Sequence, residues 1–146
     1  MSQGDTDQSS IGRTLAVVGD RWTMLILRDV FRGVRRFSEL VESLGIARNL
    51  LAERLARLVE HDVLVKVPYC DRPLRHEYRL TPKGADLSRA LIALIRWGDE
   101  WESDDTDPTV LVHDHCGTEL ELELRCPSCD VSVAPTHVRS RSGSLL

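Results

Sequence analysis

The chain has 146 residues, of which 42% are hydrophobic, so it can form one compact domain of roughly 100 residues plus an appendage and is not a disordered protein. Its longest apolar run falls far short of the ~20 residues that span a bilayer, and the polar start MSQGDTDQSS lacks both the basic and the apolar part of a signal peptide. The net charge of -4 is concentrated at the end, because 16 Lys and Arg face 14 Asp and Glu up to Trp101, whereas 3 face 9 beyond it. Four cysteines, three of them close together, fit metal binding in a reducing compartment better than a disulfide framework, so we expect a cytoplasmic protein.

Two helices are predicted near the start of the chain, after a flexible lead-in at residues 1–10. The first begins near Ser10 and carries Ile11 and Leu15 on one side. The second covers RWTMLILRDVFRG and ends at Gly33. It is apolar enough to be the central helix of the core.

A helix-turn-helix is predicted from Phe37 to His61, FSELVESLGIARNLLAERLARLVEH. Apolar residues recur every three or four residues in both halves, and Gly45 marks the turn between them. The second half turns a small, hydrogen-bonding face outward, as a helix in the major groove requires, and Arg and Asn have the donor geometry that fits guanine and adenine edges. A plain helical hairpin with a solvated polar face is the alternative. The outward residues are Arg48, Asn49, Ala52, Glu53 and Arg57.

A β-hairpin is predicted next, because the spacing of the hydrophobic residues changes from every three or four residues to every second residue. Valines alternate over residues 63–67, and residues 77–80 form a second short strand candidate. The loop YCDRPLR between them makes the hairpin a wing, whose Arg72 and Arg75 would reach the sugar-phosphate backbone or the minor groove. Two further arginines just ahead of the helix-turn-helix, which would either touch phosphates or remain solvated, are Arg35 and Arg36.

A long helix is predicted from Thr81-Pro82, a capping hydroxyl followed by proline in the first turn, to about Trp101. Its apolar residues cover more than one face, which indicates a partner helix and hence a homodimer, because a two-fold operator needs a two-fold protein. Alternatively, these residues pack onto the first helices of the same chain. A pocket lined by Trp22, Trp97 or Trp101 could hold a small-molecule effector, but the same residues equally describe a hydrophobic core. The residues assigned to the dimer interface are Ile11, Leu15, Leu87, Leu91, Leu94, Ile95, Trp97 and Trp101.

An acidic linker at residues 102–109 is predicted to lead into a small hairpin at residues 110–134. Two residue pairs, spaced His-x2-Cys and Cys-x2-Cys, flank the alternating strand TELELELR there. Brought together by a hairpin, they give a tetrahedral site of three sulfurs and one imidazole, which suits structural zinc. The open alternatives are a metal-free hairpin, a disulfide within the second pair, and His115 as the ligand from the first pair. The predicted ligands are His113, Cys116, Cys126 and Cys129, and residues 135–146 are expected to be disordered.

The sequence predicts a protein that is not an enzyme. A zinc deaminase needs a His-x-Glu upstream and a proline before its Cys-x-x-Cys, and the chain has neither. A four-ligand zinc site also leaves no open position for water. We therefore expect no catalytic cofactor, and no membrane partner.

From Ile11 to Trp101 the chain resembles the HxlR family of bacterial winged helix-turn-helix transcription regulators. The blocks GDRWTMLILRDV, RRFSEL, LLAERLARL and EYRLTPKG stand in the family's order and spacing. The resemblance implies a dimeric DNA-binding repressor or activator. Such a protein would dimerise through its first and last helices, read bases with the helix from Ala47, and touch the DNA backbone with its wing.

Two departures from the family pattern limit what can be transferred. Ala47-Arg48-Asn49 stands where members often have Ser-Pro-Arg, so the usual capping hydroxyl is lost and an operator sequence cannot be carried over. The segment QSSIGRT has no cysteine, although many members carry a redox-sensing cysteine there, so a thiol switch at that position is excluded. Cys70, in the wing, is either an oxidant sensor or an ordinary free thiol.

Together these features predict an α+β, mainly helical fold. It combines a winged helix-turn-helix domain at residues 11–101, which has a long C-terminal dimerisation helix, with a zinc-ribbon-like tail. The predicted function is sequence-specific binding of double-stranded DNA by a homodimer, with residues 47–61 in the major groove and residues 69–75 on the backbone. The alternative is a module that binds another protein and not DNA. The side chains assigned to DNA contact are Arg35, Arg36, Arg48, Asn49, Ala52, Glu53, Arg54, Arg57, Arg72 and Arg75.

Overall fold

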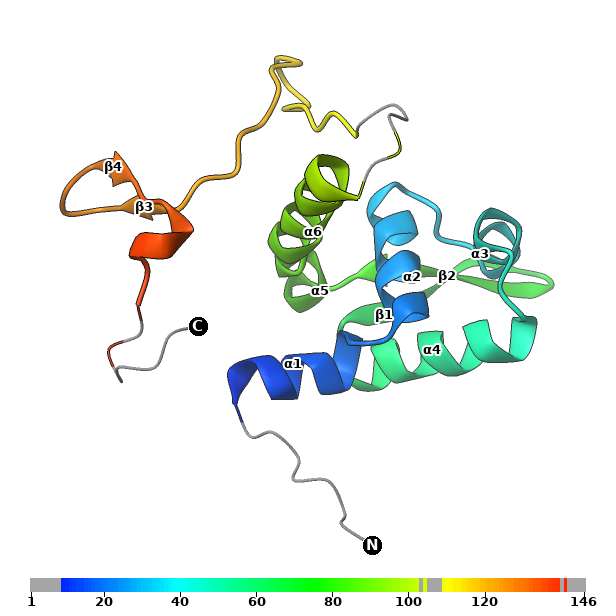
Figure 1. Ribbon diagram of the computed structural model, residues 1–146. Coiled ribbons are helices and arrows are strands. Elements are labelled where there is room, and N and C mark those ends of the chain that lie inside the picture. The colour runs from blue at the N-terminus through cyan, green and yellow to red at the C-terminus, as the bar shows by residue number, and fades with distance from the viewer. Residues whose placement is uncertain (1–8, 103, 105–108, 140, 142–146) are drawn as a thin grey trace, which may run out of the picture. The chain divides into compact units, whose positions relative to one another are not determined.

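The computed structural model describes residues 9–102, 104, 109–139 and 141. The chain divides into two units, residues 1–91 and 92–146, and their boundary falls inside a helix. No helix in the described part of the chain is long and apolar enough to cross a membrane. The elements of Figure 1 are α1 (Ser10–Val18), α2 (Arg21–Phe31), α3 (Phe37–Leu44), α4 (Arg48–Glu60), β1 (Leu64–Asp71), β2 (Leu74–Leu80), α5 (Pro82–Asp86), α6 (Ser88–Trp101), β3 (Arg125–Cys126), β4 (Val131–Ser132) and the 3-10 turn η1 (Pro135–His137).

The first unit is organised around α2, which packs against α3, α4 and β2. Ile26 and Leu27 of this helix are fully buried, so the prediction that it is the central core helix is confirmed. Asp20 caps its start by accepting a hydrogen bond from the backbone N–H of Thr23 at 3.1 Å. The buried apolar core is completed by Val18, Val30, Leu40, Ile46, Leu51, Leu55, Leu58, Val63, Leu64, Tyr78 and Leu91.

The predicted helix-turn-helix is present as α3 and α4. Gly45 ends α3 with a φ of +61°, in the left-handed region that favours glycine. Ile46 follows it into the core, and α4 then begins at Arg48. The predicted buried side of α4 is confirmed, because Leu51, Leu55 and Leu58 are fully buried.

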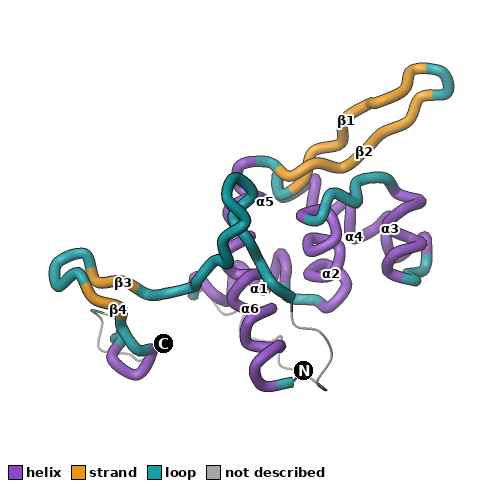
Figure 2. The backbone as a smooth tube through the Cα atoms, turned by 90° about the horizontal axis from the view of Figure 1, so that it is seen from above, coloured by secondary structure: helices purple, strands orange, loops and turns teal. Residues whose placement is uncertain are grey.

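The wing is a longer hairpin than the sequence predicted. Strands β1 and β2 pair antiparallel from Leu64 opposite Leu80 to Asp71 opposite Leu74, so only Arg72-Pro73 forms the turn. Most of the segment predicted as a loop is therefore strand, and Figure 2 shows the hairpin projecting beyond the helices of this unit. The ladder accommodates Pro68 because the register shifts just after it.

The predicted long helix is interrupted, because α5 ends at Asp86 and α6 begins at Ser88. The predicted cap is confirmed, since the Thr81 side chain accepts from the backbone N–H of Gly84 at 3.0 Å. Gly84 lies so close to the start of β1 that a Cβ there would be 2.0 Å from the carbonyl oxygen of Val63. The glycine is therefore required for α5 to pack at the base of the wing.

The second unit holds the end of α6 and two small hairpins. The first is held by the backbone bonds His113 N–H to Thr118 O and Leu120 N–H to Leu111 O, both 2.8 Å. The second pairs β3 with β4. The predicted continuous strand TELELELR is therefore only partly formed, because residues 120–124 have no ladder of their own. Of the segments expected to be flexible, residues 1–8, 103, 105–108, 140 and 142–146 lie outside the described residues.

Candidate nucleic-acid interface

The exposed side of α4 combines charged residues with small ones. Asn49, Ala52, Glu53 and Ala56 are exposed, directly opposite the buried leucines. Two alanines one turn apart leave room for this helix to approach another surface closely. Ala56 was missed by the sequence prediction, although its i, i+4 spacing from Ala52 was a usable signal.

The start of α4 has no side-chain cap for its backbone N–H groups. Ala47 is its N-cap and offers no side-chain hydrogen bond, which agrees with the predicted loss of a capping hydroxyl. The guanidinium of Arg48 lies over the Phe37 ring, with its carbon 5.1 Å from the ring centroid. Arg48 is exposed and has no acidic partner among the described residues, so its donors remain available.

Two arginines of α4 are engaged inside the protein, although the sequence analysis assigned both to DNA. Arg54 Nε donates to Asp20 Oδ1 at 3.0 Å, and the guanidinium also pairs with Glu53 at 2.7 Å. Arg57 is exposed, but its guanidinium donates to the backbone carbonyl of Ala16 in α1. These contacts hold α4 to α2 and α1, which makes them positioning contacts and not contacts to a ligand.

Thr23 and Arg54 together determine the protonation of the Asp20 carboxylate, which caps α2. Burial by itself would raise the pKa of Asp20. The hydrogen bonds from Thr23 and the guanidinium of Arg54 outweigh it, so the pKa of Asp20 is lowered from its ordinary value. The carboxylate therefore stays ionised under all but acidic conditions.

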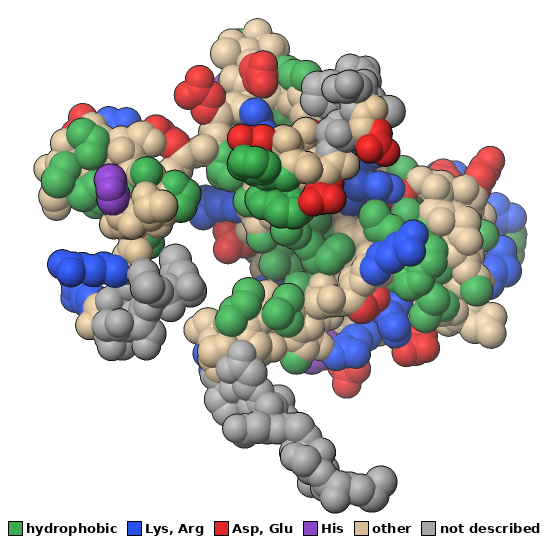
Figure 3. All heavy atoms as spheres, viewed as in Figure 1, with side chains coloured by type: hydrophobic (Ala, Val, Ile, Leu, Met, Phe, Trp, Pro, Cys, Tyr) green, Lys and Arg blue, Asp and Glu red, His purple; other side chains and the backbone are tan. Residues whose placement is uncertain are grey.

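The other arginines predicted to contact DNA differ in whether they have a partner within the protein. Arg35, Arg72 and Arg75 are exposed, and none has an acidic partner in the part of the chain that the structure describes. Arg36 instead stacks over the ring of Tyr69 at 4.3 Å and pairs with Glu39 at 4.0 Å. Figure 3 shows basic and acidic side chains interspersed over the face of this unit that is in view.

The segment before α3 is fastened to the wing, and we call residues 35–36 the strap. The N–H of Tyr78 in β2 donates to the carbonyl of Arg35 at 2.8 Å, and Arg36 forms a bridge with Glu77. Burial raises the pKa of the Tyr78 phenol, consistent with its place in the core. The strap therefore joins the helix-turn-helix and the wing by backbone hydrogen bonds.

A buried carboxylate connects α2 to α3. Asp29 is 2% exposed, and its Oδ2 accepts from the Ser43 hydroxyl at 2.6 Å while its Oδ1 accepts from Arg28 Nε at 2.9 Å. Both oxygens are therefore satisfied, as a buried carboxylate requires. No role was predicted for Asp29 from the sequence.

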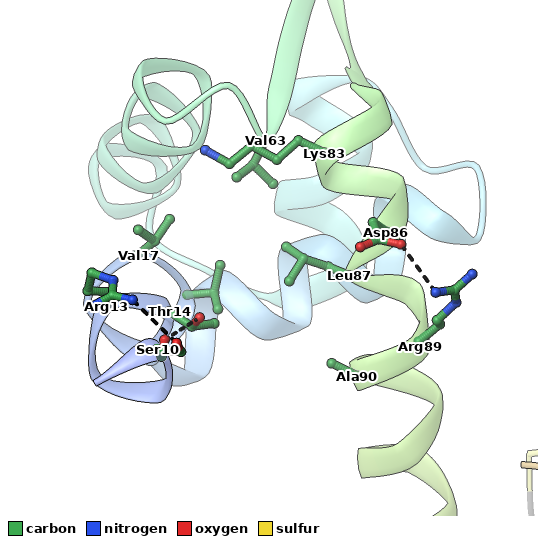
Figure 4. Close-up of a pocket in the computed structure, with 11 residues that line it drawn as sticks. Ser10, Arg13, Thr14, Val17, Val63, Lys83, Asp86, Leu87, Arg89 and Ala90 are labelled. Carbon is green, nitrogen blue, oxygen red and sulfur yellow. Dashed lines mark hydrogen bonds and ion pairs between the residues drawn. The ribbon is translucent and has the colours of Figure 1, made fainter. Parts of the chain in front are cut away.

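Exposed apolar side chains lie on α1 in the first unit and on α6 in the second. Ile11 and Leu15 of α1 are 62% and 55% exposed. Leu94, Trp97 and Trp101 of α6 are 55%, 56% and 68% exposed. Within the first unit, a cavity of about 640 Å³ lies between α1 and the segment 83–90, and Figure 4 shows residues of the two facing each other across it. None of the three tryptophans considered for an effector pocket lines this cavity.

The four predicted metal ligands come together as two pairs and not as a set of four. His113 Nδ1 lies 3.2 Å from Cys116 Sγ, so the first pair is in contact. Hydrogen bonding with the side chain and backbone of Thr118 lowers the pKa of the Cys116 thiol, and hydrogen bonding with the backbones of Cys129 and Ser128 lowers the pKa of the Cys126 thiol. All four cysteines are free thiols, and no three potential ligands form a group in the described chain.

Comparison with known proteins identifies the family of this chain. The family model described as HxlR-like helix-turn-helix matches residues 17–106. The chain belongs to the HxlR family. It has a winged helix-turn-helix fold and is related to transcriptional regulators.

Three relatives show how far the similarity extends beyond the HxlR domain. The uncharacterised HTH-type transcriptional regulator Rv3095 of Mycobacterium tuberculosis is 44% identical over 135 residues, covering 92% of this chain and 85% of Rv3095. The crystal structure of PA1607, a proposed transcription factor, has a TM-score of 0.82 at 38% identity, covering 96% of this chain and 99% of PA1607. The HTH-type transcriptional regulator YodB of Bacillus subtilis is 30% identical over 99 residues, covering 67% of this chain and 88% of YodB. The first two matches include the C-terminal hairpins, so the extension is shared with HxlR relatives.

Proposed function

We propose that this chain is a sequence-specific DNA-binding transcriptional regulator that acts as a homodimer, with α4 in the major groove and the wing on the DNA backbone. The observation that carries the proposal is the division of α4 into two sides. One side is buried through Leu51, Leu55 and Leu58, and the other presents Asn49 with two alanines. A helix held rigidly from behind, with small residues in front, has the form that major-groove reading requires.

Base reading is assigned to the first turn of α4. Arg48 and Asn49 are exposed and free of acidic partners among the described residues. Arginine is the commonest specific contact to guanine, and asparagine pairs with adenine through two hydrogen bonds. Arg54 and Arg57 are left out of this role, because their guanidiniums already have partners in the protein.

Backbone contacts are assigned to the exposed arginines beside α4. Arg35 lies just ahead of α3, and Arg72 and Arg75 lie at the end of the hairpin. Contacts of this kind fix the register of a protein on the duplex without reading sequence. Because the first 101 residues are nearly neutral in charge, these few arginines must supply much of the attraction to phosphate.

The homodimer is assigned to the exposed apolar residues of α1 and α6. Aromatic and aliphatic side chains exposed by more than half, such as Ile11, Trp97 and Trp101, need a partner surface. Two copies related by a two-fold axis would place two α4 helices about one DNA turn, roughly 34 Å, apart. The C-terminal hairpins are proposed to be a zinc-ribbon-like extension of this dimer.

The test is fluorescence anisotropy of the purified protein with the DNA directly upstream of its own gene and with a scrambled duplex, each at two salt concentrations. We expect the upstream DNA to bind at least ~1,000-fold more tightly than the scrambled duplex. We also expect binding to both duplexes to weaken with rising salt, because phosphate contacts release counterions. Equal, salt-insensitive binding to both duplexes would contradict the proposal and favour a protein partner for the winged helix.

A further inference from the structure

The two ligand pairs of the second unit lie on turns with the same backbone geometry. The N–H of Gly117 donates to the carbonyl of His113 at 2.7 Å, and the N–H of Asp130 donates to that of Cys126 at 2.9 Å. The residue after each pair has a positive φ, +70° at Gly117 and +57° at Asp130. We call residues 113–117 and 126–130 the first and second knuckle. Each knuckle presents two ligands, half of what a tetrahedral zinc site needs.

The chain does not turn back between the two knuckles. Residues 120–124 contain no helix, turn or bend, and no three potential ligands are brought together in the described part of the chain. The sequence there, Leu-Glu-Leu-Glu-Leu, has none of the Gly, Pro, Asn, Asp or Ser residues that favour tight turns. Ten extended residues would hold Cys116 and Cys126 roughly 33 Å apart. One chain on its own therefore keeps its two half-sites separate.

Both hairpins form their backbone hydrogen bonds along the same edge of the segment 118–126. The first bonds through Thr118 and Leu120, and the second through Leu124, whose carbonyl accepts from Val133 N–H at 2.7 Å. In a strand, alternate residues direct their backbone groups to the same edge. The other edge, formed by Glu119, Glu121 and Glu123, has no backbone partner among the residues that the structure describes. An unpaired edge of this length is a surface on which a second strand can add.

The spacing of the ligands is symmetric about Glu121. Cys116 and Cys126 lie five residues on either side of it, and His113 and Cys129 lie eight residues on either side. An antiparallel copy of the segment, related by a two-fold axis at Glu121, would therefore set Cys116 opposite Cys126, so that the first knuckle of one copy meets the second knuckle of the other at each end. That register also pairs odd-numbered residues with odd-numbered residues, which are the ones on the free edge.

We propose that two copies of this chain pair their 118–126 segments antiparallel and hold two structural zinc ions between them. Each ion is bound by His113 and Cys116 of one copy and by Cys126 and Cys129 of the other. Three thiolates and one imidazole give a closed tetrahedral site that suits zinc and leaves no position for water. His113 is the imidazole ligand in preference to His115, because His113 is the one already in contact with Cys116.

Burial of apolar side chains favours this pairing. Leu120, Leu122 and Leu124 are 42%, 52% and 55% exposed on one face of the segment, and two copies would join them into a row of six. On the opposite face, Glu119 would meet Glu123 of the second copy. Like charges directly opposite are unfavourable, but Arg96 lies 3.6 Å from Glu119 and Arg125 lies 3.5 Å from Glu123. Glu121, on the axis, would face its own copy and has no basic partner among the residues that the structure describes, so zinc coordination at both ends must outweigh that repulsion.

The experiment separates a site shared between copies from a site within one chain, and it rests on the homodimer of the proposed function. Two full-length variants are co-expressed with different tags, and the mixed dimer is isolated by two successive affinity steps. One variant carries His113→Ala and Cys116→Ala, and the other carries Cys126→Ala and Cys129→Ala. In the mixed dimer, only a site built across the two copies can keep four ligands. Zinc content and the absorption of bound Co²⁺ are measured for this dimer, for wild type and for each variant alone.

We expect wild type to hold two metal ions per dimer, the mixed dimer to hold one with the same Co²⁺ spectrum, and each variant alone to hold none with that spectrum. His115→Ala is the matched control and should bind metal as wild type does. The proposal is overturned if wild type binds no metal, or if wild type binds metal but the mixed dimer does not, since the second result places the site within one chain. Failure to recover any mixed dimer overturns the shared site and the homodimer together. DNA binding of the same samples shows independently whether the regulatory function stands.

Discussion

Replacing Gly84 by alanine should destabilise the protein, although alanine is the better helix former. Helix propensity alone would stabilise the variant by about 1 kcal/mol. The added Cβ, however, would lie 2.0 Å from the carbonyl oxygen of Val63, whereas real Cβ contacts are essentially never under 3.0 Å. The carbonyl belongs to the backbone and a Cβ is held rigidly by its own backbone, so α5 and the start of β1 must separate.

The cost of that separation can be worked out from the contacts around Val63. Overpacking of a tight site costs about 1–3 kcal/mol, sometimes more. The Val63 carbonyl also accepts from the N–H and the hydroxyl of Thr81, both at 3.2 Å, and each hydrogen bond is worth about 1 kcal/mol. After subtracting the propensity gain, the free energy of unfolding should fall by about 2–4 kcal/mol.

Urea unfolding followed by circular dichroism measures this difference. Ala85→Gly, at the exposed neighbouring position of α5, is the matched control, and it should lose only the propensity of about 0.5–1 kcal/mol. If Gly84→Ala were neutral or stabilising, the close approach of α5 to β1 would be refuted.

Further predictions separate base reading, positioning, pH dependence and assembly. Asn49→Ala should reduce the discrimination between bases at one position by about 1–3 kcal/mol, whereas Arg75→Ala should weaken binding to operator and scrambled DNA alike. Titrations of both duplexes measure the two effects, and equal effects of the two variants would contradict the roles assigned. Arg54→Ala should lower the free energy of unfolding without altering the order of preferred bases, and a changed order in a binding-site selection would mean that Arg54 touches DNA after all. The pKa of Asp20 is lowered in the folded state, so its ionised carboxylate stabilises the protein above the ordinary pKa of about 3.9, and this stabilisation is lost as the pH falls below that value. Wild type should therefore lose stability between about pH 5 and pH 3 more steeply than Asp20→Asn. Leu94→Asp should convert the dimer to monomers in sedimentation velocity, and an unchanged sedimentation coefficient would place the interface elsewhere.

The helix-turn-helix was predictable because its signals are local. The apolar spacing of α3 and α4 depends only on the helical period, and Gly45 marks a turn that needs a positive φ. The boundaries of α4 agree with the prediction to within one residue. No contact between distant parts of the chain was needed for either inference.

The wing and the last helix were less predictable because neighbouring structure overrides local preference. The segment YCDRPLR was predicted as a loop, but most of it is strand, because the hairpin accommodates proline at the register shift after Pro68 and at the Arg72-Pro73 turn. The interruption of the long helix at Leu87 carries no Gly or Pro signal of its own. Local sequence therefore set the existence of these elements but not their ends.

The roles of the arginines could not be predicted, because they depend on partners far away in sequence. Arg54 finds Asp20 34 residues earlier, and Arg57 finds Ala16 41 residues earlier. In sequence both look like Arg48, which has no such partner. The sequence pattern identifies which residues are polar and face outward, but only the fold shows which of them already have hydrogen-bond partners within the protein.

The strap has a consequence for how such a regulator could be switched. Since residues 35–36 bond to β2 through Tyr78 and Glu77, the wing cannot swing without pulling on the start of α3. In the proposed complex, each copy would therefore hold α4 and the wing at a fixed separation. A signal that releases DNA would then have to change the distance between the two copies, which the proposed interface of α1 and α6 and the proposed pairing of the tails would set.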